Sequence, residues 1–217
     1  MATIPFIHPS NILIAGPSQC GKTKFFKRVI KDGLIEPAPT RVLWFYGAKQ
    51  KTYDKIKQIL GSKVEFVEGF DESLVSNISA EDRNLIVIDD LMSELQRNKS
   101  LEKLFTKGSH HRNATVVLIM QNVFANSDQM RTVSLNAHYI VAFNNPRNKK
   151  QIHTLIRQIC PTNANWLMQS FEDAVRAPYG YMVFDSRTDT DERIRYRTKI
   201  FPSDPEGPFV YQQSKRI

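Results

Sequence analysis

Residues 11–23 read NILIAGPSQCGKT, an apolar run followed by the pattern G-x-x-x-x-G-K-[S/T]. The run Asn11–Ala15 predicts a buried strand, and Lys22–Lys31 has the composition of a helix. A glycine-rich loop between a strand and a helix is the context in which this pattern binds nucleotide phosphates. By chance alone, the pattern is expected in roughly one chain in a hundred of this length. The stretch therefore predicts an α/β domain that binds a nucleotide.

Each residue type in this phosphate loop has a physical role. Gly16 and Gly21 allow backbone geometries and a close approach that a Cβ atom would obstruct. The N–H groups of the loop converge on the phosphates, where the N-terminus of the helix adds positive potential. We expect Lys22 to reach the β- and γ-phosphates of ATP and Thr23 to offer its hydroxyl to Mg²⁺. The predicted nucleotide-binding residues are Gly16, Pro17, Ser18, Gln19, Cys20, Gly21, Lys22, Thr23 and Lys24.

Short apolar runs alternate with amphipathic stretches along the rest of the chain. Further predicted strands are Arg41–Tyr46, Val64–Val67, Asn84–Asp89, Ala114–Gln121, His138–Phe143, Gly180–Asp185 and Arg193–Ile200. Predicted helices are Gln50–Leu60, Glu94–Thr106, Lys149–Ile159 and Asn163–Val175. This alternation is typical of an α/β fold with a mainly parallel central sheet and helices on both faces. Together with the phosphate loop, this alternation predicts a P-loop NTPase fold.

The composition suits one soluble domain. Of the 217 residues, 41% are apolar and 24% are charged, which is ordinary for a globular protein. We expect one P-loop ATPase domain over residues 1–201, followed by a flexible tail over residues 202–217 that is rich in Pro, Ser and Gly. The sequence has no apolar run near eighteen residues and no secretory pattern, so we expect neither a membrane span nor secretion. Cys20 and Cys160 are predicted to be reduced thiols.

The net charge of the chain is +8. A basic surface attracts polyanions, most obviously nucleic acid. The same charge is also compatible with simple solubility or with an acidic protein partner. The charge therefore favours DNA or RNA as a partner without deciding the matter.

Two carboxylates end the predicted strand NLIVIDDL, residues 84–91. In P-loop enzymes the first such aspartate holds Mg²⁺, directly or through water. We assign that role to Asp89, together with Thr23. Asp90 is the candidate general base that polarises the attacking water. The alternative is that either aspartate only caps the turn after the strand.

Gln121 ends the predicted strand Ala114–Gln121. Ligands of open α/β sheets bind at the carboxyl ends of the strands. If this strand lies beside the phosphate-loop strand, Gln121 reaches the γ-phosphate or the attacking water. Otherwise it is a polar strand end that bonds the next loop, and Asn122 is the weaker substitute for the sensor role.

Three arginines are candidates for a residue that completes the site of a neighbouring subunit. Ring ATPases use such a cation because it stabilises the charge that grows in the transition state. The candidates are Arg112, Arg131 and Arg147, each beside a predicted strand near the same edge. An isolated arginine is otherwise a solvated or ion-paired surface residue. Arg112 also belongs to GSHHRN, residues 108–113, which is either a DNA-facing loop or a turn whose histidines bond the backbone.

These residues resemble the DNA-packaging ATPases of large eukaryotic DNA viruses and of virus-like Polinton (Maverick) transposons, within the FtsK–HerA group of DNA-pumping P-loop ATPases. The resemblance spans Gly16 to Asp185. It rests on GPSQCGKT, NLIVIDDLM, LFTKGSHHRNATVVLIMQNVF, RTVSLNAHYIVAFNNPRN and PYGYMVFD. The sequence departs from the family pattern at Asn144 and Asn148, where relatives tend to have Lys and Asp.

The resemblance implies a P-loop NTPase of the additional-strand (ASCE) type. It also implies an ATPase that uses ATP and Mg²⁺ to move double-stranded DNA into a preformed capsid. It places Lys22 and Thr23 on the phosphate and Mg²⁺ positions, Asp89 and Asp90 on the acidic pair, and Gln121 on the polar sensor. The implied partners are capsid or portal vertex proteins and further copies of the chain in a ring of five or six subunits, with no membrane. The implied location is the cytoplasm or nucleus of an infected or host cell.

Two other functions remain open on the residues alone. A nucleotide or nucleoside kinase needs an acceptor pocket, whereas two acids and a glutamine at the strand ends suit the activation of water better. A module that binds ATP and DNA without turnover would use the phosphate loop but not Asp90 as a base.

Overall fold

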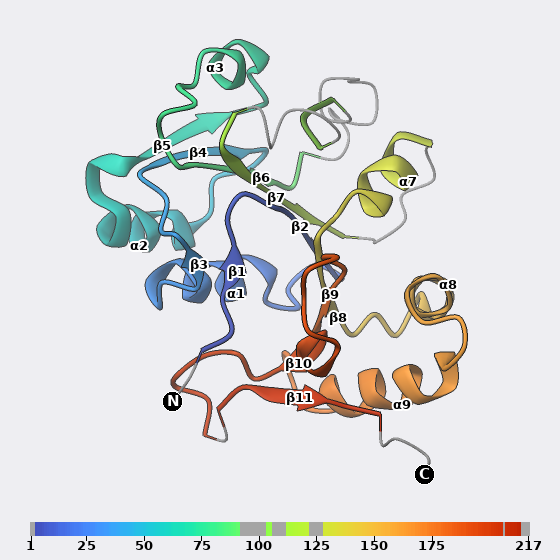
Figure 1. The fold of residues 1–217 in the computed structure, drawn as a ribbon. Coiled ribbons are helices and arrows are strands. Elements are labelled where there is room, and N and C mark those ends of the chain that lie inside the picture. Colours follow the sequence, from blue (N-terminus) through green and yellow to red (C-terminus); the bar gives the residue numbers. More distant parts are fainter. Residues whose placement is uncertain (1–2, 92–102, 106–111, 122–127, 206, 214–217) are drawn as a thin grey trace.

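The computed structural model describes residues 3–91, 103–105, 112–121, 128–205 and 207–213. Within these residues, nine strands form one central sheet in the order β11-β10-β9-β8-β2-β7-β6-β4-β5. Helices cover both faces of this sheet (Figure 1). The expected α/β fold with a mainly parallel sheet is therefore confirmed.

Six neighbouring strands of the sheet run parallel, and three antiparallel strands extend one edge. The parallel strands are β2 (Asn11–Ala15), β4 (Arg41–Tyr46), β5 (Val64–Glu68), β6 (Asn84–Asp89), β7 (Ala114–Met120) and β8 (Tyr139–Phe143). The antiparallel strands are β9 (Tyr181–Asp185), β10 (Tyr196–Thr198) and β11 (Phe209–Tyr211). Because β7 pairs with both β2 and β6, an additional strand separates the phosphate-loop strand from the acidic strand.

The two faces of the sheet are buried by different helices. One face packs against α1 (Lys22–Lys31) and α2 (Lys51–Leu60). The other packs against α3 (Glu72–Ser76), α7 (Asp128–Leu135), α8 (Lys149–Ile159) and α9 (Ala164–Ala174). Alternating side chains of β2 serve both cores, since Ile12 and Ile14 face α1 while Leu13 and Ala15 face the other layer. The full burial of these strands explains why their sequences are continuously apolar.

Short elements complete the described fold. A separate pair of parallel strands consists of β1 (Phe6–Ile7) and β3 (Ile35–Glu36). Two 3₁₀ turns cover Gly61–Lys63 and Glu192–Ile194. Among the described residues, no helix has the length and apolar character of a membrane span.

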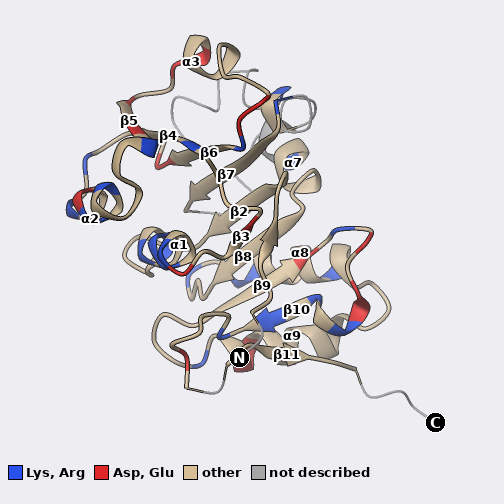
Figure 2. Cartoon of the chain, turned by 60° about the vertical axis from the view of Figure 1, so that its left-hand side comes forward, with Lys and Arg blue, Asp and Glu red and all other residues tan. Residues whose placement is uncertain are grey.

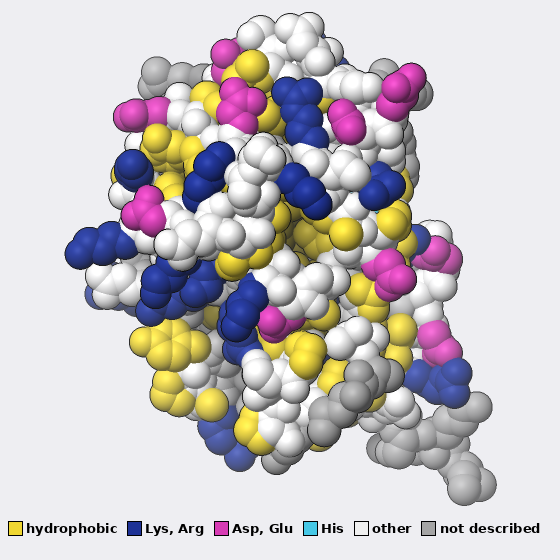
Figure 3. All heavy atoms as spheres, turned by 90° about the vertical axis from the view of Figure 1, so that its left-hand side faces the viewer, with side chains coloured by type: hydrophobic (Ala, Val, Ile, Leu, Met, Phe, Trp, Pro, Cys, Tyr) yellow, Lys and Arg dark blue, Asp and Glu magenta, His cyan; other side chains and the backbone are white. Residues whose placement is uncertain are grey.

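The basic side chains of α1 and α2 form one surface. These helices lie side by side on the sheet, and Figure 2 shows Lys and Arg along both of them. Figure 3 shows that Lys and Arg side chains gather on this side of the molecule. We call this surface the basic face and define it by Lys24, Lys27 and Lys31 of α1 and by Lys51 and Lys55 of α2. Helix α1 has no acidic residue, so it carries a concentrated positive charge.

Part of the segment after Phe201, which the sequence predicts to be a flexible tail, makes defined contacts in the structure. Its residues Phe209–Tyr211 form β11, which pairs with β10. Asp204 accepts hydrogen bonds from the Arg28 guanidinium at 2.9 Å and from the backbone N–H of Phe201 at 3.1 Å. The Arg28 guanidinium carbon also lies 3.8 Å from the centre of the Phe201 ring. The tail therefore packs onto α1 and the sheet edge as far as its described residues extend.

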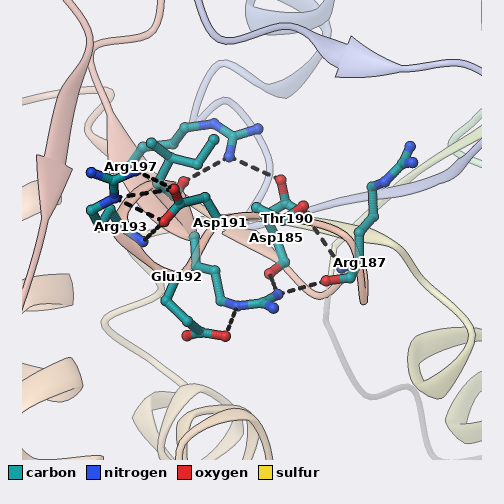
Figure 4. Close-up of polar contacts among 9 residues, drawn as sticks. Asp185, Arg187, Thr190, Asp191, Glu192, Arg193 and Arg197 are labelled. Atoms are coloured by element: carbon teal, nitrogen blue, oxygen red, sulfur yellow. Dashed lines mark hydrogen bonds and ion pairs between the residues drawn. The ribbon is translucent and has the colours of Figure 1, made fainter.

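A buried ion pair anchors the antiparallel edge of the sheet (Figure 4). Arg197 is fully buried, and its guanidinium donates to the Asp185 carboxylate at 3.0 Å and to the Ile194 carbonyl at 2.9 Å. The other Asp185 oxygen accepts from the Thr190 hydroxyl at 2.9 Å and from the Arg187 backbone N–H at 3.2 Å. The predicted strand Arg193–Ile200 is shorter in the structure, because its first residues belong to the 3₁₀ turn Glu192–Ile194 and only Tyr196–Thr198 form β10.

Candidate nucleotide-binding site

The carboxyl ends of the parallel strands meet at one edge of the sheet, and backbone bonds tie them together. The N–H of Gly16 after β2 donates to Met120 of β7 at 3.2 Å. The N–H of Asp90 after β6 donates to Ile119 of β7 at 3.4 Å. The N–H of Gly47 after β4 donates to the carbonyl of Asp89 at 3.2 Å. The loops that leave β2, β4 and β6 are therefore each hydrogen-bonded to a neighbouring strand of the sheet.

The phosphate loop has the backbone that its glycines permit. Gly21 caps α1 in the left-handed region with φ 102°, a conformation that L-residues other than glycine rarely adopt. A Cβ atom at Gly16 would lie 2.7 Å from both Cys20 Sγ and Phe143 Cβ. Both glycines are therefore fixed by sterics, as the sequence pattern predicts. Cys20 itself is half-buried, and burial raises the pKa of its thiol, so the group stays neutral at physiological pH.

Lys22 turns back into the phosphate loop. Its ammonium donates to the carbonyls of Gly16 at 2.7 Å and Pro17 at 2.8 Å. These contacts hold the cation at the N-terminus of α1, where the loop N–H groups and the helix dipole also favour an anion. The position suits a cation that moves onto phosphate oxygens when a nucleotide binds.

Asp89 is the buried charge of the site. Only 2% of its surface is exposed, and its Oδ2 accepts from the Thr23 hydroxyl at 3.2 Å and from the Tyr53 hydroxyl at 3.0 Å. Burial raises the pKa of this carboxyl to about 6, and the hydrogen bonds from Tyr53 and Thr23 oppose the increase. Burial, with the Asp89 charge beside it, raises the pKa of Tyr53, which therefore remains a donor. Sequence reasoning missed Tyr53, because an aromatic residue in an amphipathic helix has the pattern of a core residue.

Asp90 and Gln121 lie at the same strand ends as Asp89. Asp90 is exposed and takes a left-handed φ of 59°, which turns the chain sharply after β6. Gln121 follows β7, the strand beside β2, and is also exposed. Both residues line the same cavity as the phosphate loop. The structure thus brings together the predicted acidic pair and the predicted polar sensor.

The cavity over the phosphate loop has a volume of about 560 Å³. Its lining includes nine of the predicted residues: Ser18, Gln19, Gly21, Lys22, Thr23, Lys24, Asp89, Asp90 and Gln121. It also includes four that sequence reasoning did not assign to a site: Gln50, Thr52, Ile119 and Tyr179. Gly16, Pro17 and Cys20 shape the loop beneath the cavity and do not line it.

The oxygen donors of the site fit a Mg²⁺ ion. Thr23 and Asp89 present a hydroxyl and a carboxylate 3.2 Å apart, and Mg²⁺ prefers such hard oxygen ligands. In the described part of the chain, no group of three or more His, Cys, Asp or Glu side chains is placed to hold a metal.

The three candidate arginines occupy different places. Arg147 is exposed in the loop after β8, at the carboxyl edge of the sheet, and Arg131 is exposed on α7. Arg112 precedes β7, so it lies at the amino edge, roughly 23 Å from the phosphate loop along a seven-residue strand. The expectation that all three lie near the same edge is therefore wrong for Arg112. Their role toward a neighbouring subunit stays a prediction.

Some predicted features lie outside the described residues. These are the histidines of GSHHRN, the substitute sensor Asn122, and the helix Glu94–Thr106 except for its residues 103–105.

We compared the chain with known proteins by sequence and by structure, and only the comparison of structures found similar proteins. No protein-family model matches the chain, and no curated protein matches it significantly in sequence. Among solved structures, the DNA-packaging ATPase B204 from Sulfolobus turreted icosahedral virus superposes with a TM-score of 0.53 at 14% identity, over 83% of this chain and 94% of that chain. B204 from Sulfolobus turreted icosahedral virus 2, in complex with AMP, gives a TM-score of 0.52 with the same identity and coverage.

A third similar structure is the KaiC-like protein PH0186 from Pyrococcus horikoshii OT3. Its TM-score is 0.50 at 16% identity, over 95% of this chain and 91% of that chain. At these identities the likeness concerns the fold, which matches P-loop NTPase structures. The structures of B204 include complexes with AMP and with ATP-gammaS.

Proposed function

We propose that the chain hydrolyses ATP with Mg²⁺ and uses the free energy to move double-stranded DNA during the packaging of a viral or virus-like genome. The observation that carries the proposal is the single cavity that gathers Lys22, Thr23, Asp89, Asp90 and Gln121. These residues come from three separate strand ends and supply the cation, the metal ligands, the base and the polar sensor that ATP hydrolysis requires.

The phosphate loop and the buried Asp89 would together bind ATP and Mg²⁺. The phosphates of ATP would accept hydrogen bonds from the loop N–H groups and from Lys22, whose ammonium already lies within the loop. Thr23 and Asp89 would hold Mg²⁺, which neutralises charge on the phosphate oxygens when bound. Tyr53 fixes the Asp89 carboxylate from the side of α2.

Activation of water is assigned to the exposed carboxylate. Asp90 lines the cavity and is accessible to solvent, so it can accept the proton of an attacking water. Gln121 would orient that water or contact the γ-phosphate from β7. An exposed acid and an amide at adjacent strand ends favour hydrolysis over transfer to a nucleoside acceptor.

The DNA substrate is supported by charge and by similarity. The net charge is +8, and the basic face concentrates cations on α1 and α2. Such a surface attracts the phosphate backbone of DNA without reading its sequence. The sequence resembles DNA-packaging ATPases, and the fold is similar to that of B204, a DNA-packaging ATPase.

Assembly into a ring of five or six subunits is part of the same proposal. A ring would bring a neighbour's arginine to the open cavity, and Arg147 is the candidate that lies at the same edge of the sheet as the phosphate loop. Capsid or portal vertex proteins are the proposed docking partners of the ring.

The test is ATP hydrolysis by the purified chain with and without linear duplex DNA. DNA-stimulated turnover that is lost in Lys22→Ala is expected, because that cation offsets charge on the transferring phosphoryl group. Lys63→Ala, which removes an exposed lysine away from the cavity, is the matched control and should retain turnover. ATP binding without turnover under any DNA condition would instead favour the non-hydrolysing module, and phosphorylation of a nucleoside would favour the kinase.

A further inference from the structure

Tyr179 borders the nucleotide cavity on the side away from the acidic pair. It precedes β9, whose first residue, Tyr181, pairs with Phe143 at the carboxyl end of β8. In the sheet order, β8 and β9 lie on one side of β2, whereas β6 with Asp89 lies on the other. Tyr179 and Asp89 therefore approach the cavity from opposite sides of the phosphate loop.

The backbone of Tyr179 is held in an uncommon conformation. Its φ of 63° is left-handed, which is unfavourable for a bulky residue. The turn is closed by a hydrogen bond of 2.9 Å from the N–H of Gly180 to the carbonyl of Ala177, three residues after the end of α9. Strained residues of this kind persist where the surrounding structure fixes them, and they cluster at ligand sites.

The ring of Tyr179 sits at the first turn of α1 but is not buried there. A Cβ atom placed on Gly21 would lie 3.2 Å from its Cδ1, and Lys24 Nζ lies 5.9 Å from the ring centre. Despite these contacts, 67% of the residue is exposed, the largest value among the exposed large hydrophobic residues described. A large aromatic surface is thus held open at the mouth of the cavity.

We infer that the Tyr179 ring stacks on the base of the bound nucleoside triphosphate. The inference rests on the proposed function, in which the phosphates occupy the loop and Mg²⁺ lies at Thr23 and Asp89. With the phosphate and metal end fixed there, the base can extend toward the opposite side, where the exposed ring stands. Stacking uses the π-face that every base has. The ring therefore adds affinity for ATP and GTP alike and leaves the choice of base to other groups.

The test compares a ligand that has a base with one that lacks it. Affinities for a non-hydrolysable ATP analogue and for inorganic tripolyphosphate, each with Mg²⁺, would be measured by calorimetry on the wild type, Tyr179→Ala and Tyr179→Phe. We expect Tyr179→Ala to weaken the ATP analogue roughly 10- to 100-fold, the range of base–aromatic stacking. Tripolyphosphate should bind unchanged, and Tyr179→Phe should bind the analogue about as tightly as the wild type, because stacking needs no hydroxyl.

A second variant separates the ring from the strained backbone. Tyr179→Gly also removes the ring, but glycine adopts the left-handed conformation without strain. It should match Tyr179→Ala in affinity while unfolding at a higher temperature than that variant. Binding of the analogue at wild-type strength by Tyr179→Gly would overturn the inference.

Two further outcomes contradict the stacking role. Equal losses for the analogue and tripolyphosphate would show that the residue only positions the phosphate loop. No loss for either ligand would assign the exposed ring to another partner, such as a neighbouring subunit. If the wild type bound neither ligand, the proposed ATP site itself would fail, and this result is distinct from a failure of stacking alone.

Discussion

Replacing Asp89 by asparagine is expected to stabilise the unliganded protein at neutral pH while abolishing hydrolysis. The carboxylate is 2% exposed, and burial raises its pKa from 3.8 to about 6. A group whose pKa is higher in the folded state favours folding fully below the unfolded pKa, and this contribution is lost as the pH rises through the folded pKa. Ionisation of the buried carboxylate therefore destabilises the apo fold progressively as the pH rises from 3.8 to about 6, and the destabilisation is complete above that range.

The size of the effect follows from the difference between the two pKa values. A difference of about 2 units corresponds to at most about 3 kcal/mol in the free energy of unfolding at pH 7.5. At pH 4.5, where the carboxyl is mostly protonated in the folded state, the same relation gives a destabilisation of only about 1 kcal/mol. Asparagine carries no charge and keeps one oxygen that can accept from the Tyr53 and Thr23 hydroxyls. The variant should therefore be more stable than the wild type by most of the amount calculated at each pH.

The assay is urea denaturation at pH 7.5 and pH 4.5, in EDTA and without nucleotide. Asp89→Asn should unfold at a higher urea concentration than the wild type at pH 7.5, with a smaller gain at pH 4.5. Glu65→Gln, which removes a charge from an exposed position on β5, is the control and should change stability by less than about 0.5 kcal/mol. An equal gain at both pH values, or a loss at pH 7.5, would refute the reasoning from burial.

Three other changes give separate tests. Gly16→Ala should abolish nucleotide binding and cost about 1–3 kcal/mol in thermal unfolding, because its Cβ would lie 2.7 Å from two side-chain atoms; wild-type binding would contradict the close packing. Asp185→Asn should cost about 3–5 kcal/mol in urea unfolding, since it leaves Arg197 charged and fully buried; a loss below 1 kcal/mol would disprove that pairing. Lys31→Glu with Lys55→Glu should weaken duplex binding and reduce its salt dependence, whereas an unchanged salt slope in a filter-binding titration would place DNA elsewhere.

Much of the fold could be predicted because its elements carry strong local signals. The predicted bounds of Asn11–Ala15, Lys22–Lys31, Arg41–Tyr46, Asn84–Asp89 and Lys149–Ile159 coincide with those of the structure. Buried parallel strands have continuously apolar sequences, and the glycine–lysine turn marks the start of α1. Such segments depend little on distant partners.

The elements that the sequence did not reveal depend on distant partners. The three residues of β11 carry no pattern of their own and become a strand by pairing with β10. Asp204 holds the preceding segment through Arg28 of α1, 176 residues away in the sequence. Helix α7 lacks a regular apolar repeat and was also not predicted.

In the candidate site too, some residues could be predicted from local sequence signals, whereas others depend on contacts between distant elements. The grouping of Lys22, Asp89 and Gln121 follows from parallel topology, which brings the carboxyl ends of the strands to one edge. Tyr53 and Tyr179 were missed because their roles come from contacts between elements, not from spacing in the sequence. Arg112 was placed at the wrong edge, because it precedes its strand whereas Arg147 follows one.

The backbone bonds that join the loops after β2, β4 and β6 to their neighbours have a consequence for hydrogen exchange. The amides of Gly16, Gly47 and Asp90 lie in loops, yet each donates to a carbonyl of the central sheet. Their protons should therefore exchange with solvent as slowly as those of the strands, unlike amides of ordinary surface loops. Because these loops are already ordered before a ligand binds, little binding free energy is spent on immobilising them.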